Sequence, residues 1–149
     1  MEPRTTQILT VEDDPRFRKL LTTVLSKCGR YHVRAADLDR WREDLQETPP
    51  DVLLLDLRLG TQDTVADIPG IVRACPTTMV AALTARAAED EEPSVLTAGA
   101  FTFYEKIGIH RLPDYLEEDL ALFRRALTGE DVVAPSALSR RRTSHEPSM

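Results

Sequence analysis

The feature that most constrains this chain is an uninterrupted apolar run that ends in a carboxylate. Val52 to Leu55 are all aliphatic, and Asp56 follows them directly. A strand with one face in water alternates apolar and polar side chains, so a continuous run predicts a central strand buried on both faces. In open α/β sheets, sites form in the crevice outside the carboxyl ends of the strands. We therefore expect Asp56 to be the chemical centre of the molecule.

Chain length and composition set the expected domain organisation. The 149 residues are 42% hydrophobic, which favours one core rather than two full domains. We expect one domain over residues 1–128 and a flexible tail over residues 129–149. The tail is polar and rich in serine and arginine, so it cannot bury enough surface to order itself. It is also too short to form an output domain.

Charge and hydropathy exclude several partners. The net charge of -6 and the pI of about 5.1 argue against nucleic acid binding, which depends on basic surface. Arg140 to Arg142 are expected only to solubilise the tail. No run approaches the roughly 18 apolar residues of a membrane span, and the N-terminus lacks the apolar core of a signal peptide. We expect a cytoplasmic protein without a membrane partner, in which Cys28 and Cys75 stay reduced.

Apolar periodicity predicts five strands that alternate with five helices. The expected strands span residues 8–11, 31–36, 52–56, 79–83 and 101–106. Each helix is expected to start at a capping residue, a proline or an acidic block. The five starts are Asp14 with Pro15; Asp37 or Asp39; Asp67 with Pro69; the acidic block Glu89 to Glu92 ahead of Pro93; and Pro113. The second helix is expected to carry an apolar stripe of Leu38, Trp41 and Leu45. Residues 57–64 are expected to form a polar loop. The alternation predicts a doubly wound α/β fold, a parallel sheet with helices on both faces.

Candidate site residues follow four of these strands. They are Glu12 and Asp13 after the first strand, Asp56 after the third, Thr84 after the fourth and Lys106 after the fifth. All carboxyl ends lie along one edge of a parallel sheet, so these side chains should converge. Three carboxylates repel one another without a cation, and Mg²⁺ is the hard, oxygen-seeking ion that suits them. A carboxylate beside such an ion and a phosphate donor is a nucleophile, so Asp56 is the expected phosphoryl acceptor.

Five motifs carry a resemblance to a known family. They are Val11-Glu12-Asp13-Asp14-Pro15, Pro50 to Asp56, Leu83-Thr84-Ala85, Ala98-Gly99-Ala100 and Lys106. Thr84 and Lys106 follow Asp56 by 28 and 50 positions (84 − 56 and 106 − 56). In these features the chain resembles a receiver domain of the two-component response regulators, over roughly Gln7 to Leu127.

The resemblance implies a strand order of 2-1-3-4-5 and a role for each site residue. It implies that Glu12, Asp13, Asp56 and the backbone carbonyl of Arg58 hold Mg²⁺. It implies phosphorylation of Asp56 by a histidine kinase or a histidine phosphotransfer protein, with Lys106 pairing with the phosphoryl group. Thr84 would contact that group, and Thr84 and Phe103 would act as the switch.

The chain departs from the family pattern at two places. Leu59-Gly60 stands where the family usually has Met-Pro, and Thr64 stands where it usually has Gly. Ile107 replaces the proline that usually follows the lysine.

These features favour a stand-alone receiver that is not an enzyme and signals through contact with a downstream protein. The implied contact face comprises residues 89–98, 101–106 and 113–127, and it is also a possible homodimer surface. Tyr115 and Leu122 belong either to that face or to ordinary helix packing. A second interpretation is a pseudo-receiver, a phosphorylation-independent interaction module. A third is an aspartate-dependent phosphatase or phosphotransferase, but such enzymes add a cap for which this chain has no room.

Overall fold

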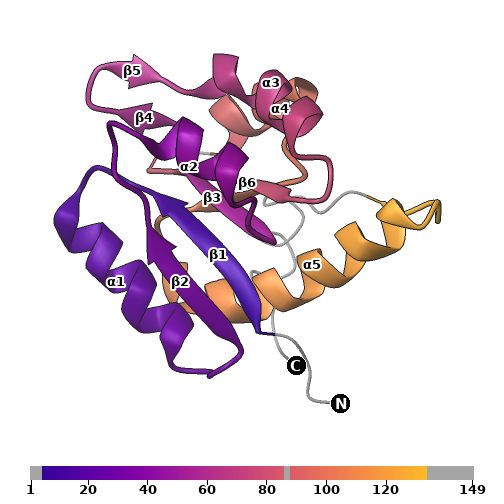
Figure 1. Ribbon diagram of the computed structural model, residues 1–149, viewed down its shortest axis with the longest axis horizontal. Helices are drawn as coiled ribbons and strands as arrows, with labels where there is room; N and C mark the ends of the chain where they lie inside the picture. The colour runs from indigo at the N-terminus through magenta and orange to yellow at the C-terminus, as the bar shows by residue number, and fades with distance from the viewer. Residues whose placement is uncertain (1–4, 86–87, 134–149) are drawn as a thin grey trace.

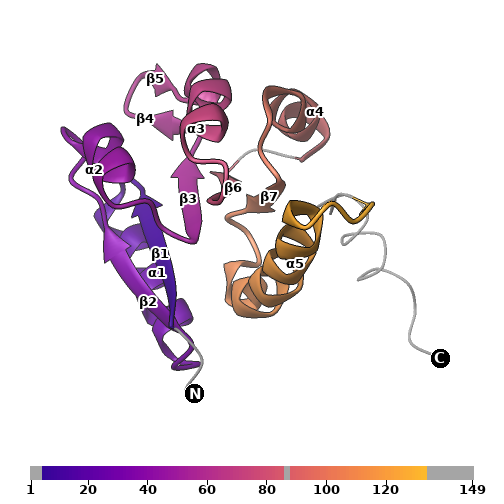
Figure 2. The same ribbon diagram turned by 45° about the vertical axis from the view of Figure 1, so that its right-hand side comes forward.

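The computed structural model describes residues 5–85 and 88–133. Its centre is a parallel sheet of five strands in the order β2-β1-β3-β6-β7 (Figures 1 and 2). The strands are β1 (Thr6–Val11), β2 (Tyr31–Ala35), β3 (Val52–Asp56), β6 (Met79–Thr84) and β7 (Thr102–Glu105). In sequence order this is 2-1-3-4-5, so the predicted doubly wound fold is confirmed.

Helices cover both faces of the sheet. On one face lie α1 (Pro15–Ser26) and α5 (Leu112–Leu127), whose buried leucines share one apolar cluster. On the other lie α2 (Trp41–Glu47), α3 (Ile68–Ala74) and α4 (Ala88–Ala98) (Figure 2). Two short 3₁₀ turns, η1 (Val65–Asp67) and η2 (Ile109–Arg111), precede α3 and α5. None of the helices in the described ranges is long and apolar enough to cross a membrane.

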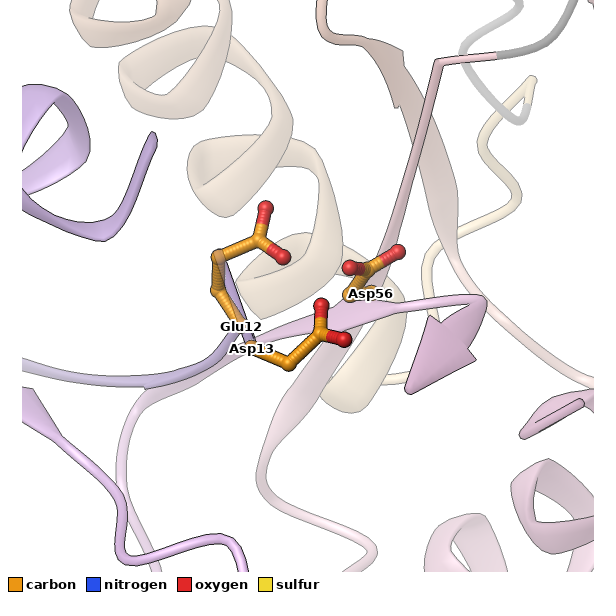
Figure 3. Close-up of side chains that lie close together, drawn as sticks. All are labelled: Glu12, Asp13 and Asp56. Atoms are coloured by element: carbon orange, nitrogen blue, oxygen red, sulfur yellow. The ribbon is translucent and has the colours of Figure 1, made fainter. Parts of the chain in front are cut away.

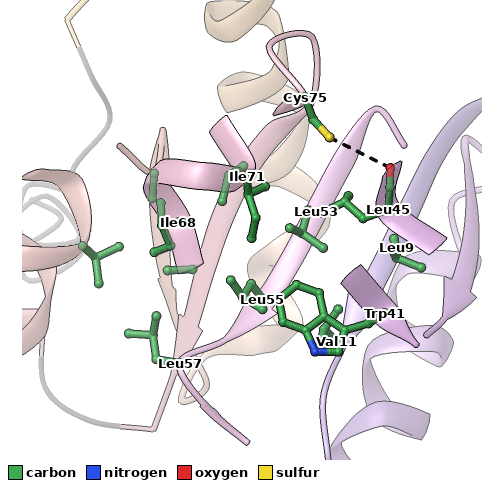
Figure 4. Packing of buried hydrophobic residues seen from close by; sticks show 14 of the residues in the cluster. Leu9, Val11, Trp41, Leu45, Leu53, Leu55, Leu57, Ile68, Ile71 and Cys75 are labelled. Carbon is green, nitrogen blue, oxygen red and sulfur yellow. Dashed lines mark hydrogen bonds between the residues drawn. The ribbon is translucent and has the colours of Figure 1, made fainter. Parts of the chain in front are cut away.

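Strand β3 is buried along its whole length, as its apolar run predicts. Leu53 and Leu55 pack with Trp41 in the cluster beneath α2, α3 and α4 (Figure 4). Val52 and Leu54 point to the opposite face and pack in the α1 and α5 cluster. The sheet therefore separates two apolar clusters, and β3 contributes alternate side chains to each.

The predicted start of α1 is confirmed. The Asp14 carboxylate accepts a hydrogen bond from the Arg16 backbone N–H at 2.9 Å, and Pro15 is the first helical residue. Gly29 follows the helix with φ of +68°, the left-handed conformation that its position predicts.

The predicted start of α2 is wrong. The helix begins at Trp41 after Arg40, and no side chain caps it. The Asp37 carboxylate instead accepts from the Asp39 backbone N–H, which holds a turn ahead of the helix. Leu38 lies in that turn with 36% of its surface exposed, so it does not belong to the apolar stripe.

The predicted cap of α3 is also wrong. Asp67 ends η1 and makes no capping hydrogen bond. Its carboxylate accepts two hydrogen bonds from the Arg42 guanidinium, at 3.0 and 3.2 Å, which ties α2 to α3. Arg42 on the neighbouring helix thus binds, with two hydrogen bonds, the carboxylate that the local sequence pattern assigned to the helix cap.

Two further segments differ from expectation. The predicted polar loop after Asp56 contains an antiparallel hairpin, β4 (Arg58–Leu59) and β5 (Gln62–Asp63). Helix α4 has 11 residues with Pro93 in its interior, rather than a brief helix after the acidic block. Most of the predicted tail, residues 134–149 with the three arginines, lies outside the described residues.

Candidate functional site

The structure brings three acidic side chains together at the carboxyl edge of the sheet. Glu12 and Asp13 follow β1, and Asp56 ends β3 (Figure 3). One carboxylate oxygen of each lies within 4.8 Å of the others. Strand pairing explains this arrangement, because Val11 lies beside Leu55 in register and both strands deliver their next residues to the same edge.

Lys106 is the cation of this cluster. Its Nζ lies 2.5 Å from Glu12 Oε1 and 3.3 Å from Asp56 Oδ2. Its backbone N–H donates to the Thr84 carbonyl at 2.7 Å, which fixes the turn after β7 against the end of β6. The ammonium also lies 4.7 Å from the centre of the Phe17 ring on α1, a cation–π contact. Although Ile107 replaces the usual proline and is 84% exposed, Lys106 points into the site.

Burial and charge shift the acid–base properties of the cluster. Glu12 is only 1% exposed, and this desolvation raises its pKa to about 8. The neighbouring Asp56 adds to the rise, while Lys106 opposes it. Burial by itself lowers the pKa of Lys106, but the neighbouring Glu12 and Asp56 have the larger combined effect and raise it.

Asp13 behaves differently because backbone donors reach it. Its limited burial favours the neutral acid, but the Gly60 N–H donates to Oδ2 at 2.8 Å. This bond and contacts with Glu12 and Asp56 lower the pKa of Asp13. Asp13 is therefore held ionised beside two buried carboxylates.

The donor set suits a hard divalent cation. All three side chains offer oxygen, and one lysine leaves the group with an excess of negative charge. Mg²⁺ prefers oxygen ligands and tolerates a partly hydrated site held by a few carboxylates. The predicted fourth ligand, the Arg58 backbone carbonyl, belongs to the first residue of β4, and the N–H of Arg58 donates to Asp56 Oδ1 at 3.1 Å.

The predicted switch residues lie behind the site and are both buried. Thr84 ends β6 one position after Leu83, the register partner of Asp56. Phe103 of β7 packs in the same apolar cluster as Val95 of α4. Thr84 therefore adjoins the end of β3, and Phe103 packs in a cluster that includes α4.

Several residues with direct contacts to the site were not assigned roles from sequence. Phe17 contacts Lys106, Gly60 contacts Asp13, and Thr64 donates its hydroxyl proton to the Asp56 carbonyl at 2.8 Å. Gly60 and Thr64 were recognised only as departures from the family pattern. Phe17 fits the apolar stripe of α1, so periodicity alone gives it no other role.

Fold and site together define a doubly wound α/β protein with an acidic cluster at the carboxyl edge of its sheet. The chain matches the response regulator receiver domain over residues 8–116 and belongs to that family. Members of the family accept phosphoryl groups and bind Mg²⁺ at an acidic cluster. They interact with histidine kinases or phosphotransfer proteins and with downstream effectors.

Curated relatives are longer than this chain. A protein-glutamate methylesterase/protein-glutamine glutaminase of Xanthomonas oryzae pv. oryzae is 32% identical over 127 residues, which cover 80% of this chain and 35% of that protein. The KDP operon transcriptional regulatory protein KdpE of Escherichia coli is 32% identical over 124 residues, 83% of this chain and 54% of that protein. The chain thus spans about a third of the length of the first of these relatives.

Solved structures support the fold. The signal receiver domain of NarL from Mycobacterium tuberculosis superposes with a TM-score of 0.69 at 24% identity, covering 80% of this chain and 98% of that domain. A CheY-like receiver domain from Methanospirillum hungatei gives a TM-score of 0.71 at 20% identity, covering 83% and 99%.

Proposed function

We propose that Asp56 accepts a phosphoryl group from a phosphohistidine of a histidine kinase or a phosphotransfer protein. The observation that carries this proposal is the position of Lys106, whose ammonium lies between the carboxylates of Glu12 and Asp56. A half-buried cation at this place can neutralise a phosphoryl oxygen as it arrives.

The chemistry is a phosphoryl transfer from nitrogen to oxygen. One carboxylate oxygen of Asp56 attacks phosphorus, a P–O bond forms, and the P–N bond to the donor imidazole breaks. The leaving imidazole nitrogen keeps the electron pair and takes a proton from solvent. Mg²⁺, held by Glu12, Asp13, Asp56 and the carbonyl of Arg58, would supply positive charge for the phosphoryl oxygens.

The chain's own groups orient the nucleophile. Arg58 N–H donates to Asp56 Oδ1, and Lys106 Nζ donates to Oδ2, so both oxygens have a defined direction. The carboxylate therefore has little freedom to turn away from an incoming phosphorus. Holding reacting atoms in position is a large part of phosphoryl-transfer catalysis.

The output we infer is a contact with a second protein. Thr84 adjoins the site, and Phe103 packs against the cluster that includes α4, which supports a repacking of both residues on phosphorylation. The face made by α4, β7 and α5 would then change its affinity for a downstream protein or for a second copy of the chain.

The test is intact-protein mass after incubation with acetyl phosphate and Mg²⁺. Wild type should gain one phosphoryl group only when Mg²⁺ is present. Asp56→Asn should gain none, whereas the matched control Asp131→Asn, at an exposed carboxylate far along the chain, should behave as wild type. Absence of any modification, together with absence of beryllium fluoride binding, would instead favour the pseudo-receiver.

A further inference from the structure

The segment Arg58 to Thr64, which we call the strap, leaves the site and then returns to it. Its strands β4 and β5 pair antiparallel, with Arg58 opposite Asp63 and Leu59 opposite Gln62. The strap begins two residues after Asp56. Besides the bond from the Arg58 N–H to the Asp56 carboxylate, it makes two further hydrogen bonds to acidic residues of the cluster. The segment is therefore built into the site rather than extended away from it.

The first attachment is at the turn of the strap. Gly60 has φ of +61°, a conformation that side chains other than those of glycine and asparagine rarely adopt. In this conformation its N–H donates to Asp13 Oδ2 at 2.8 Å, across 47 positions of sequence. Proline, which the family usually has here, possesses no N–H and could not make this bond.

The second attachment is at the far end of the strap. Thr64 is fully buried, and its hydroxyl donates to the Asp56 backbone carbonyl at 2.8 Å. The Thr64 N–H also donates to the carbonyl of Leu57 at 3.0 Å. Glycine, which the family usually has here, lacks the hydroxyl. The departures from the family pattern at Gly60 and Thr64 thus each supply a hydrogen bond to a site residue.

We propose that Gly60 and Thr64 are positioning residues that fix Asp13 and Asp56 relative to each other for Mg²⁺ binding. The inference rests on the proposed function, because it assigns these bonds to the cation site of that function. A carboxylate has about four acceptor positions, so Asp13 can keep the Gly60 bond and still offer an oxygen to a cation. Arg58 lies at the start of the strap, ahead of both attachments, and its N–H orients the Asp56 side chain.

A rigid support of this kind acts on metal affinity. Hydrogen bonds to metal ligands fix their orientation, and their loss usually weakens binding about 10- to 100-fold. The strap bonds join protein groups to one another and do not involve the ion, so they hold the ligand residues in place and reduce the reordering that binding requires. Variants that lose one bond should therefore bind Mg²⁺ more weakly.

The experiment is a titration of each full-length variant with Mg²⁺ alone, followed by amide chemical shifts. Thr64→Val removes the hydroxyl at nearly constant volume. Gly60→Pro removes the N–H together with the positive φ of the turn, which a proline ring cannot adopt. Both should weaken Mg²⁺ binding about tenfold or more. The matched controls Thr64→Ser and Gly60→Asn keep the donors, and open space surrounds a Cβ at Gly60. They should stay within about threefold of wild type.

A second measurement needs no metal. Hydrogen exchange at the Gly60 amide should be slow in the metal-free wild type and faster in Asp13→Ala, because the acceptor is gone. The positioning role of the strap would be overturned if wild type, Thr64→Val and Gly60→Pro bound Mg²⁺ with equal affinity, or if the Gly60 amide were unprotected. Either result would leave the proposed function intact. A wild type that takes up no Mg²⁺ at all would overturn both.

Discussion

Lys106 lies closer to Glu12 than to Asp56, with Nζ–oxygen distances of 2.5 and 3.3 Å. The lysine thus makes its shorter contact with a carboxyl group that is expected to hold Mg²⁺. We expect a cation bound to the cluster to take over this role, which would leave Lys106 available for the proposed contact with a phosphoryl group.

We expect Lys106→Met to destabilise the metal-free protein. The change leaves two buried carboxylates without their cation, which should cost about 1–3 kcal/mol of unfolding free energy. Urea unfolding should show that saturating Mg²⁺ recovers part of this loss. The matched control Lys27→Met, at the exposed end of α1, should change stability by less than about 0.5 kcal/mol. Equal losses for the two variants would contradict the counter-ion role.

Glu12 should make the metal-free protein less stable as pH rises. Its pKa is about 8 in the fold against 4.5 for an ordinary glutamate, so the folded state binds more protons between these values. The contribution of Glu12 to the free energy of unfolding is therefore fully present below pH 4.5 and is lost as pH rises toward 8. Glu12→Gln should be more stable than wild type at pH 8 by at least about 1 kcal/mol.

The comparison across pH is the decisive measurement for Glu12. Urea unfolding without metal at pH 5 and pH 8 should give a stability difference between Glu12→Gln and wild type that grows with pH. Mg²⁺ should bind wild type more tightly at the higher pH, because binding releases the proton. A difference that does not vary with pH would exclude the raised pKa.

Leu54→Ala should destabilise the fold by about 2–5 kcal/mol, because Leu54 is fully buried in the central strand. The matched control is Leu20→Ala on α1, where 43% of the leucine is exposed, and it should cost less than about 1 kcal/mol. Thermal and urea unfolding of the two variants measure the contrast. Similar losses would show that β3 is not the centre of the core.

Tyr104→Phe should cost about 1–3 kcal/mol of stability. The Tyr104 hydroxyl donates to Asp119 Oδ2 at 2.7 Å, and the Thr102 hydroxyl donates to the same oxygen at 2.9 Å. Asp119 is buried, so the lost donor leaves part of its acceptor capacity unsatisfied. Tyr31→Phe is the control, because that hydroxyl makes only a 3.4 Å bond to Pro113, and urea unfolding should show a smaller loss.

Sequence alone predicted a parallel sheet and the convergence of the acidic residues, because the carboxyl ends of parallel strands lie along one edge. The strand order came from the resemblance to the receiver family, and the structure confirms it. The β3 run and the strand-end residues Glu12, Asp56 and Lys106 needed no detail of the loops to be placed. The receiver family is confirmed by the match over residues 8–116.

The helix starts show what local patterns miss. Asp14 caps α1 as predicted, but Asp67 pairs with Arg42, 25 positions away. A capping residue is only one possible partner of a carboxylate, and a guanidinium brought close by the tertiary fold offers two stronger bonds. The same limit applies to Gly60, whose contact with Asp13 exists only once the hairpin has formed.

The two apolar clusters on opposite faces of the sheet also have a consequence for how the molecule can change. Leu21 of α1 and Ile71 of α3 belong to different clusters, with the sheet between them. Substitutions at such distant sites should act additively. Substitutions on one face of the sheet can therefore create a new binding surface without disturbing the other face. They leave in place the acidic cluster at the carboxyl edge of the sheet, which both faces adjoin.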